Sequence, residues 1–365
     1  MSVQEVIARE LGLSQATISR VISRPDMVKP ATRDRVLKAM EKHKYQPNQL
    51  ANRLRAGGLE MLGICVSSIS NDYFVSLIHG VEFAAGERGW SVVIECTHND
   101  LAAERRSIEE MRSLQFGGLL ILPHPEAADI YRELKRLRFP FVFIDRHLEG
   151  VAAPFVGTDE AVGGRLVAEH LLQLGHRRIA HVHGPEGYSS FQERGEAFEN
   201  LLSRHGVALD PRCRVPGFQP NQKAASTTEA YGEKDVPRQL RTDHTMDDPE
   251  GGREALRRLL KLPKSERPTA VMCDNDYYAT GVMLEAIQQG LSVPDDLSIV
   301  GFSGARWTSW LPVPLTTIVQ PAYRIGERAV KQLFDVRGSG KISRKHCQLE
   351  PRLDIQASTG PPPSR

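Results

Sequence analysis

Most of this chain alternates short apolar runs with longer amphipathic segments, and this alternation limits the folds that it can adopt. The apolar runs have the pattern of strands buried on both faces, and the segments between them have helical spacing. The expected strands are Leu62–Val66, Ser91–Cys96, Gly118–Leu122, Phe141–Ile144, Ile179–Val182, Ala270–Cys273 and Leu297–Phe302. The expected helices are Val75–Gly86, Ala103–Leu114, Ala161–Leu174, Phe191–His205, Gly252–Leu260 and Tyr277–Gln289. This order predicts doubly wound domains with parallel sheets, and so long a series favours two sheets.

The first 46 residues have a different pattern, which predicts three short helices. The first helix has an apolar face of Val3, Val6, Ile7 and Leu11 and ends at Gly12. Ser14 can cap a second helix whose apolar residues are Ile18, Val21 and Ile22. A third helix, from Pro30 to His43, is expected to bury Val36, Leu37 and Met40. Two short helices joined by a glycine-containing turn and braced by a third predict a helix-turn-helix domain.

The polar face of the second helix has side chains suited to reading DNA bases. In a helix-turn-helix domain this helix enters the major groove. Gln15 and Arg20 are residue types that pair with adenine and guanine edges, and Ala16 can contact a thymine methyl group. Ser14, Thr17 and Ser19 are expected to contact the DNA backbone. The alternative is that these residues form only the solvated face of a small helical domain.

The charge distribution favours the DNA-binding interpretation. The net charge of the whole chain is only +2, but residues 1–60 have 11 basic and 6 acidic side chains, a balance of +5. The other 305 residues have a balance of −3. A basic head on a mildly acidic body is an asymmetry found in proteins that bind nucleic acids.

The head closely resembles the lactose/galactose-repressor (LacI/GalR) family of bacterial transcription factors. The matching residues are Gly12-Leu13-Ser14-Gln15-Ala16-Thr17-Ile18-Ser19-Arg20-Val21-Ile22-Ser23, Val28, Thr32-Arg33, Tyr45-Gln46-Pro47-Asn48 and Ala51-x-x-Leu54. The resemblance implies that residues 47–58 form a hinge helix that orders on the operator. It also implies that Leu54 wedges into the minor groove, where Ala51, Arg53 and Arg55 accompany it, and that Asn48 contacts the backbone. Insertion of an apolar side chain beside arginines is how minor-groove binders kink a base step.

The resemblance continues through the body, from about Met61 to Arg337. It rests on Ser70-Asn71-x-Tyr73-Phe74, Ile144-Asp145-Arg146, Asp159 with Gly163-Gly164, His170-Leu171, Leu174-Gly175-His176-Arg177-Arg178-Ile179, Gly184-Pro185, Arg194 with Phe198, Pro268-Thr269-Ala270-Val271, Asn275-Asp276 and Pro314-Leu315-Thr316-Thr317. It implies a body like the periplasmic binding proteins, with an effector cleft between two subdomains. The implied effector-binding residues are Asn71, Tyr73, Phe74, Asp145, Arg146, Arg194, Phe218 and Asp276. In doubly wound sheets, ligands bind beyond the carboxyl ends of the strands, where these residues fall.

Three departures from the family pattern affect the effector site. Ser303-Gly304 replaces the usual pair of aspartates after a late strand, and Glu160 replaces the usual asparagine after Asp159. A polar insertion of about 25 residues, roughly 218–243, reads as an exposed loop. The expected division is a helix-turn-helix domain at 1–46, a hinge at 47–58, an effector-binding and dimerisation domain at 59–357 and a flexible tail at 358–365. The tail has no heptad repeat to build a tetramer.

Other classes of function have weaker support in the sequence. Gly301-Phe302-Ser303-Gly304-Ala305 nearly matches the nucleophile elbow of hydrolases but has alanine in place of the last glycine. His181 and His183 lie on one face of a strand and could bind a metal, although buried structural histidines fit the pattern better. The five cysteines have no C-x-x-C spacing, which favours reduced thiols in the cytoplasm. No apolar stretch approaches the roughly 18–20 residues of a membrane span.

We therefore expect a cytoplasmic, sequence-specific transcriptional repressor that binds a pseudo-palindromic operator as a homodimer. Its effector is expected to be a sugar, a sugar acid or a related metabolite, with no cofactor, no metal and no catalytic activity. The alternatives from other classes are a binding protein that only senses a ligand and an enzyme built on the same fold.

Overall fold

The computed structural model describes residues 2–23, 25–45, 60–217, 248–342 and 345–363. Its contacts divide the chain into two units. The first unit covers Met1–Met61 and Met111–Gly117, and the second covers the remaining residues. We call residues 2–45 the head and the described residues from 60 onward the body, and we describe each by itself. The hinge at 47–58 and the insertion at 218–243 lie outside the described residues.

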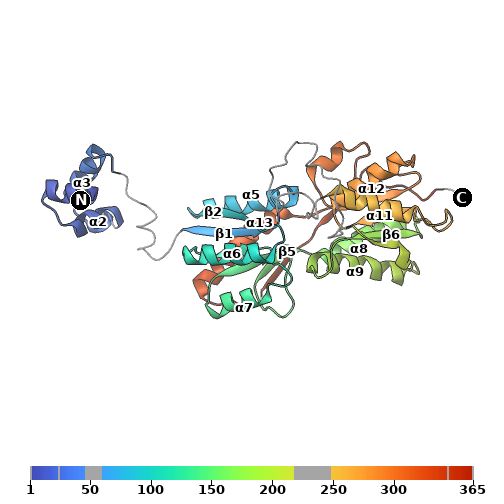
Figure 1. The fold of residues 1–365 in the computed structure, drawn as a ribbon, viewed down its shortest axis with the longest axis horizontal. Coiled ribbons are helices and arrows are strands. Elements are labelled where there is room, and N and C mark those ends of the chain that lie inside the picture. The colour runs from blue at the N-terminus through green and yellow to red at the C-terminus, as the bar shows by residue number, and fades with distance from the viewer. Residues whose placement is uncertain (1, 24, 46–59, 218–247, 343–344, 364–365) are drawn as a thin grey trace. The chain divides into compact units, whose positions relative to one another are not determined.

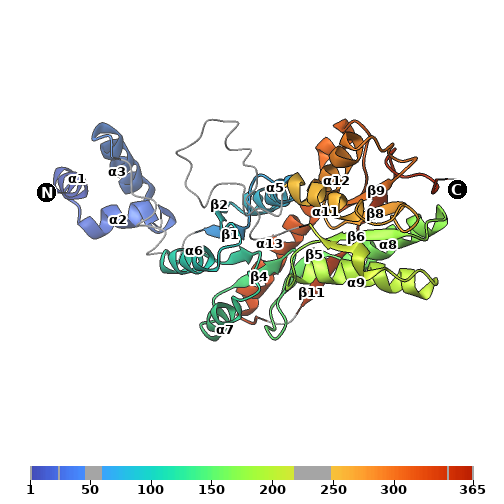
Figure 2. The same cartoon turned by 45° about the vertical axis from the view of Figure 1, so that its right-hand side comes forward.

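The head is the helix-turn-helix domain that the sequence predicts. Its helices are α1 (Val3–Leu11), α2 (Gln15–Ser23) and α3 (Pro30–Lys42), with a short 3-10 turn η1 (Pro25–Met27). Ser2 and Glu5 form a capping box at the start of α1, and Gly12 ends α1 in the left-handed conformation. The core consists of Ile7, Ala8, Ile18, Val21, Val36, Ala39 and Met40. Figure 2 shows the three helices of this domain.

Three apolar residues that we expected in this core are exposed. Val3 and Val6 lie at the edge of the apolar face of α1, and their side chains are 41% and 37% exposed. Leu37 is 51% exposed, because α3 turns Val36 and Met40 toward α1 and α2. A three-helix domain of this size buries only a narrow stripe of each helix.

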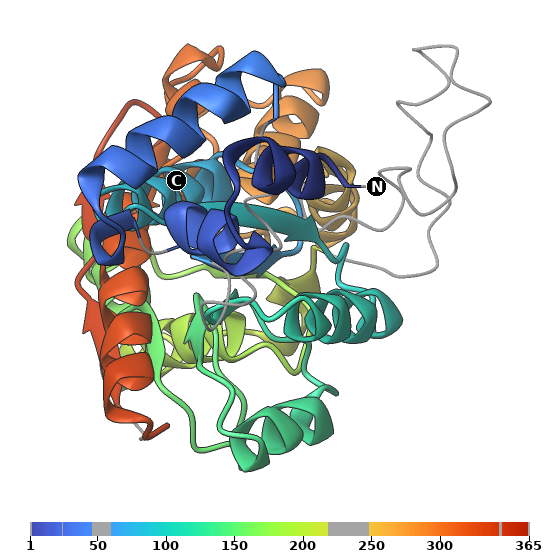
Figure 3. The same ribbon diagram turned by 90° about the vertical axis from the view of Figure 1, so that its left-hand side faces the viewer.

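The N-terminal subdomain of the body is a six-stranded sheet with helices on both faces. Its strands are β1 (Met61–Val66), β2 (Ser91–Cys96), β3 (Leu119–Ile121), β4 (Phe141–Ile144), β5 (Phe155–Thr158) and β11 (His346–Leu349). They lie in the order β11-β5-β4-β3-β1-β2, and β11, β5, β4, β3 and β1 run parallel to one another. Its helices are α5 (Asp72–Gly86), α6 (Leu101–Ser113), α7 (Ala128–Arg136) and α13 (Ala322–Ser339). In Figure 3, α13 (red) lies on one side of the strands and α6 and α7 (teal and green) lie on the other.

The C-terminal subdomain repeats this architecture. Its strands are β6 (Ile179–His183), β7 (Arg214–Pro216), β8 (Ala270–Cys273), β9 (Ser298–Ser303), β10 (Thr316–Val319) and β12 (Arg352–Asp354). They lie in the order β12-β10-β9-β8-β6-β7, and β12 is antiparallel to β10. Its helices are α8 (Glu160–Gln173), α9 (Ser189–Arg204), α11 (Pro249–Leu259) and α12 (Asp276–Gln288), with 3-10 turns η2 (Pro211–Cys213) and η5 (Arg306–Trp310). Figure 1 shows the two sheets with their helices.

The chain passes between the two subdomains three times. It crosses from β5 to α8, returns from β10 to α13, and crosses again from β11 to β12. The polar loops that follow the carboxyl ends of both sheets therefore meet at one place. The expected fold class, a helix-turn-helix head with two doubly wound parallel sheets, is confirmed.

Two expectations about the body are wrong. Ser91–Cys96 is not buried on both faces, because β2 is the edge strand of its sheet and its side chains are exposed or half-buried. The expected flexible tail is docked through its first residues. Ser358 is fully buried, receives a 2.8 Å hydrogen bond from Thr316 N and donates one of 2.6 Å to Ile299 O. Among the residues that the structure describes, no helix has both the length and the apolar character needed to cross a membrane.

Candidate DNA-reading helix and ligand cleft

The residues that α2 buries determine which of its faces is exposed. Ile18 and Val21 point into the head core, so the opposite side of the helix is directed to solvent. The predicted base-reading residues Gln15, Ala16 and Arg20 are all exposed on that side. A helix with its core face fully used and its N-terminal polar residues exposed has the form that enters a major groove.

The residues expected to contact the DNA backbone organise the start of α2. The Ser14 hydroxyl accepts a 3.1 Å hydrogen bond from Thr17 N and lies 2.9 Å from Thr17 Oγ1, so it caps the helix. Ser19 is half-buried on the same helix. The other expected DNA contacts, Asn48, Ala51, Arg53, Leu54 and Arg55, lie outside the described residues.

A polar cleft lies between the two sheets of the body, at the carboxyl ends of their strands. It contains a cavity of about 60 Å³. Six of the eight predicted effector-binding residues line it: Asn71, Tyr73, Phe74, Asp145, Arg146 and Arg194. The described lining also includes Ser67, Ser68, His98, Asn99, Ser190, Phe191, Asn275, Ser303 and Gln320. Phe218 lies outside the described residues.

Backbone strain is concentrated in this cleft. Of the seven non-glycine residues with positive φ in the described parts of the chain, four line the cavity. They are His98, Asn99, Asp145 and Ser303, with φ of 51°, 55°, 65° and 142°. Such conformations cost free energy and occur mainly at functional sites, where they place side chains that a relaxed backbone would not.

The cleft contains two buried acid–base pairs. Asp145 and Arg146 follow β4; burial raises the pKa of Asp145, and the charge of Arg146 offsets part of that rise. Arg194 comes from α9 and forms a 2.8 Å ion pair with Glu160 at the start of α8. Burial also raises the pKa of Glu160, and the charge of Arg194 opposes that rise. Gly164 lets α8 and α9 approach closely, since a Cβ there would lie 2.1 Å from Arg194 O.

Asp276 is absent from the described lining of the cavity, unlike our expectation for an effector-binding residue. It is fully buried, and its two oxygens accept hydrogen bonds from Thr317 Oγ1 (2.6 Å) and Ala305 N (2.8 Å). Burial raises its pKa to about 6 despite these donors. Asp276 therefore holds the turn after β9, where Ser303 and Gly304 replace the family's usual residues.

Several contacts close the cleft by joining the two subdomains. His147 N donates to Ser189 Oγ at 3.0 Å, and the His147 ring lies 2.7 Å from Glu193 Oε1. The Tyr277 hydroxyl donates to Ser70 O at 3.1 Å, and the Arg146 guanidinium lies 4.2 Å from the centre of the Tyr188 ring. These contacts, with the small cavity, identify a closed arrangement of the body.

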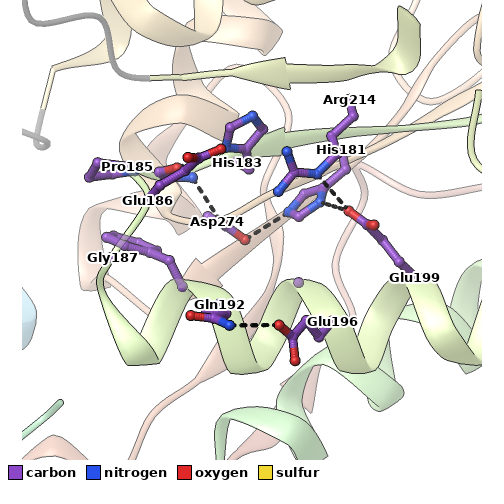
Figure 4. Close-up of a pocket in the computed structure, with 13 residues that line it drawn as sticks. His181, His183, Pro185, Glu186, Gly187, Gln192, Glu196, Glu199, Arg214 and Asp274 are labelled. Carbon is purple, nitrogen blue, oxygen red and sulfur yellow. Dashed lines mark hydrogen bonds and ion pairs between the residues drawn. The ribbon is translucent and has the colours of Figure 1, made fainter. Parts of the chain in front are cut away.

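A larger cavity of about 360 Å³ lies between β6, β7 and α9 (Figure 4). The fully buried His181 ring bridges Asp274 Oδ1 (3.0 Å) and Glu199 Oε1 (2.9 Å). Burial alone would lower the pKa of His181, but the two carboxylates outweigh burial and raise it to about 9. Gly195 makes room for the ring, because a Cβ there would lie 2.9 Å from His181 Cε1.

These histidines have the structural role that the sequence favoured over a metal site. His181 is bonded on both ring nitrogens, and the His183 Nδ1 lies 2.8 Å from Gly184 O. No group of three or more metal-binding side chains occurs among the described residues. The polar groups of this cavity bond mainly to one another, whereas the smaller cleft combines side chains from both subdomains.

Sequence reasoning missed several cleft residues for identifiable reasons. His98 and Asn99 follow edge strand β2, and Gln320 follows β10, which has no strong strand pattern of its own. Glu160 was identified only as a departure from the family, without a partner. The general signal, a polar residue directly after a parallel strand, could have found His98 and Asn99.

Comparisons with known proteins agree with this architecture. Residues 4–48 match the family described as bacterial regulatory proteins, lacI family. Residues 60–227 match the periplasmic binding proteins and sugar binding domain of the LacI family, and residues 168–359 match a periplasmic binding protein-like domain.

Whole-chain relatives span both the head and the body. The HTH-type transcriptional repressor CytR of Escherichia coli K12 is 30% identical over 354 residues, 97% of this chain and 95% of that protein. The ribose operon repressor of Halalkalibacterium halodurans is 28% identical, over 97% of this chain and 96% of that protein. The crystal structure of the lac repressor dimer bound to operator and the anti-inducer ONPF superimposes with a TM-score of 0.78 at 23% identity, covering 97% and 98% of the two chains.

A helix-turn-helix head joined to a two-subdomain body with a polar cleft defines a transcriptional regulator with a ligand-binding domain. The relatives described above have the same two parts over nearly their whole length. The chain belongs to the lacI family of bacterial transcriptional regulators.

Proposed function

We propose that this protein is a repressor that binds a two-fold symmetric operator as a homodimer and responds to a small polar ligand in the cleft of its body. The observation that carries the DNA-binding part is the exposure of Gln15, Ala16 and Arg20 opposite the buried face of α2. A single head spans one half-site, so a two-fold operator requires two copies of the chain. The hinge contacts the minor groove at the centre of that operator through Leu54, Ala51, Arg53 and Arg55.

The ligand-binding part rests on the strained and polar lining of the cleft. The ligand is held by Asn71, Tyr73, Phe74, Asp145, Arg146 and Arg194, which the structure brings together around one cavity. The lining supplies hydroxyl, amide and aromatic groups, which suit a small polar ligand. Ligand and operator affect each other's affinity by the same factor, because their coupling is reciprocal.

The test begins with DNA selection by the purified full-length protein from a random pool. We expect enriched sequences with two inverted half-sites, and enrichment of sequences without such symmetry would contradict the proposal. A melting-temperature screen of sugars, sugar acids and nucleosides then identifies ligands, and each stabilising compound is tested for its effect on operator affinity.

We also propose that the protein acts in the cytoplasm and does not turn its ligand over. All five cysteines are free thiols, which suits a reducing compartment. Incubation of the protein with any ligand from the screen should return the compound unchanged by mass spectrometry. Formation of a product would favour the alternative of an enzyme, and ligand binding without any operator binding would favour a simple ligand-binding protein.

A further inference from the structure

Each of the three nitrogens of the Arg194 guanidinium has a partner within the protein. Arg194 is 4% exposed, and its Nε donates to Glu160 Oε2 at 2.9 Å and to Ser190 O at 3.2 Å. Its NH2 lies 2.8 Å from the same Glu160 oxygen, and its NH1 donates to Asp274 O. One face of the guanidinium lies 3.8 Å from the centre of the Phe302 ring. Arg194 therefore enters the cleft with its charge already paired.

Arg146, the second cation of the described lining, is engaged as well. Its Nε donates to Pro123 O at 2.8 Å, its NH2 donates to Asn99 Oδ1 at 3.1 Å, and Tyr188 stacks against its plane. Asp145 beside it is a second buried carboxyl group that faces the cavity. Two guanidinium groups are thus matched by two carboxyl groups, Asp145 and Glu160. An anionic ligand would meet no unmatched positive charge among the described lining residues and would have to approach Asp145.

Glu160 is held in place by donors on every side. Its Oε2 accepts from Arg194, and its Oε1 accepts from Gln320 Nε2 at 3.2 Å. Gln320 in turn donates to Thr158 Oγ1 at 2.9 Å, so the carboxylate belongs to a fixed buried network. Because every one of these partners donates, the geometry suits the ionised form of Glu160.

The cleft still offers groups to an uncharged ligand. The Tyr73 hydroxyl is buried and lies near Asp145, but it makes no well-formed hydrogen bond with any described residue. A buried hydroxyl whose hydrogen bonding is incomplete costs free energy that a ligand hydroxyl or amide can recover. Phe74 and Phe191 add aromatic surface, and Ser67 and Ser68 add further hydroxyl groups.

We propose that Glu160 is a specificity-determining residue that restricts the cleft to uncharged ligands by neutralising Arg194. This inference rests on the proposed function of the cleft as the effector site. The carboxylate of Glu160 lies against the guanidinium of Arg194, and an uncharged side chain at position 160 would leave that positive charge unneutralised. Ligands that carry a carboxylate or phosphate group are excluded, while their uncharged counterparts bind.

The experiment compares the wild type with Glu160→Gln by isothermal titration calorimetry on the full-length protein. Glutamine keeps an oxygen that can accept from Arg194 but removes the charge that neutralises it. The probes are charge-matched pairs, D-ribose with D-ribonate and D-glucose with D-glucuronate, together with acetate as a carboxylate without a scaffold. Glu196→Gln is the control, because it makes the same chemical change two residues after Arg194 on α9, outside the cleft lining.

We expect the wild type and Glu196→Gln to bind none of the carboxylates saturably. Glu160→Gln should bind them saturably, with an affinity roughly 10- to 100-fold above the detection limit reached with the wild type, the range of one charge-assisted hydrogen bond. The gain should disappear in the double variant Glu160→Gln/Arg194→Met. If Glu160→Gln does not fold, Glu160→Asn replaces it, since asparagine is the residue usual at this position in the family.

The proposal is overturned if the wild type binds ribonate, glucuronate or acetate in a way that Arg194→Met abolishes. It is also overturned if Glu160→Gln binds acetate no better than Glu196→Gln does. These results are independent of operator binding. A failed DNA selection would contradict the proposed function, but the charge selectivity of the cleft could still be measured. A successful DNA selection without the expected change in carboxylate binding would contradict only the role of Glu160.

Discussion

At the scale of single residues, what matters in this protein is which polar side chains are satisfied internally and which are left for a partner. His181 and Asp276 are both buried and bonded to their own subdomain. Arg20 and Gln15 are exposed on a helix whose other side is buried. The first pair serves stability, and the second pair is available for DNA.

Arg20→Ala should relax the base preference at one position of each operator half-site. Loss of a bidentate contact to a base costs ~1–3 kcal/mol of discrimination, whereas affinity for other sequences should change little. Competition binding with a set of operators that carry single substitutions measures this. A uniform loss of affinity for all sequences would show that Arg20 contacts only phosphates.

His181→Gln should change how stability depends on pH. The pKa of His181 in the folded protein is about 9, above its ordinary value of 6.5. The stabilisation is therefore fully present below pH 6.5 and is lost as the pH rises through about 9. Linkage gives a loss on the order of 3 kcal/mol across this window.

Denaturant unfolding at several pH values tests this expectation, with His205→Gln at an exposed site as the control. The difference in unfolding free energy between the wild type and His181→Gln should shrink as the pH rises from 6 to 9. A difference that stays constant over this range would mean that the His181 charge contributes nothing to the fold.

The sequence predicts these residues unequally well, for physical reasons. The position of Arg194 after a strand and on a helix was predictable, but its ion pair with Glu160 depends on the packing of α8 against α9. Asp276 follows the strand pattern of a ligand-binding residue, yet its carboxylate turns toward the backbone after β9. Periodicity places a residue at the end of a strand, whereas the direction of its side chain depends on contacts distant in sequence.

At the scale of helices and strands, the close packing of α8 on α9 positions the cleft. The length and burial of an element determine how well the sequence predicts it. Strands with a full apolar run, such as β4 and β8, were predicted with their bounds, and the helices α5, α6, α8, α9, α11 and α12 were predicted within a few residues. The sequence missed β5, β7, β10, β11 and β12, which have only three or four residues each, and it also missed the helices α7 and α13.

Gly164→Ala should destabilise the body and disturb Arg194. A methyl group at position 164 would lie 2.1 Å from Arg194 O, so α8 and α9 must move apart. Overpacking of this kind costs roughly 1–3 kcal/mol. Gly86→Ala is the matched control, because a Cβ at that helical glycine meets nothing within 4 Å. Thermal unfolding of both variants measures the difference, and equal melting temperatures would contradict the close approach.

At the scale of the whole body, the two subdomains are held together by polar contacts across the cleft rather than by a shared apolar core. The apolar clusters around α5 and α13, around α11 and α12, and around α8 and α9 each lie within one subdomain. Contacts of this kind break and re-form more readily than a packed core, which suits a hinged pair of domains.

The double variant His147→Ala/Tyr277→Phe should open the cleft of the free protein. It removes the contacts of the His147 ring with Glu193 and of the Tyr277 hydroxyl with Ser70. Hydrogen exchange followed by mass spectrometry should show faster exchange at residues 67–74 and 189–194, with unchanged exchange in β8. Ser309→Ala, at an exposed hydroxyl far along the chain, is the control. Unchanged exchange in the double variant would mean that other contacts hold the cleft closed.

The small size of the closed cavity has a kinetic consequence. About 60 Å³ has room for a few water molecules, and a monosaccharide needs several times that volume. Binding of a ligand of that size therefore requires the subdomains to move apart. At high ligand concentration the association rate should stop rising and level off at the rate of opening, on the microsecond-to-millisecond scale of hinge motions. After a sudden rise in ligand concentration, the rate of the response would then be set by the opening rate of the protein and not by the ligand concentration.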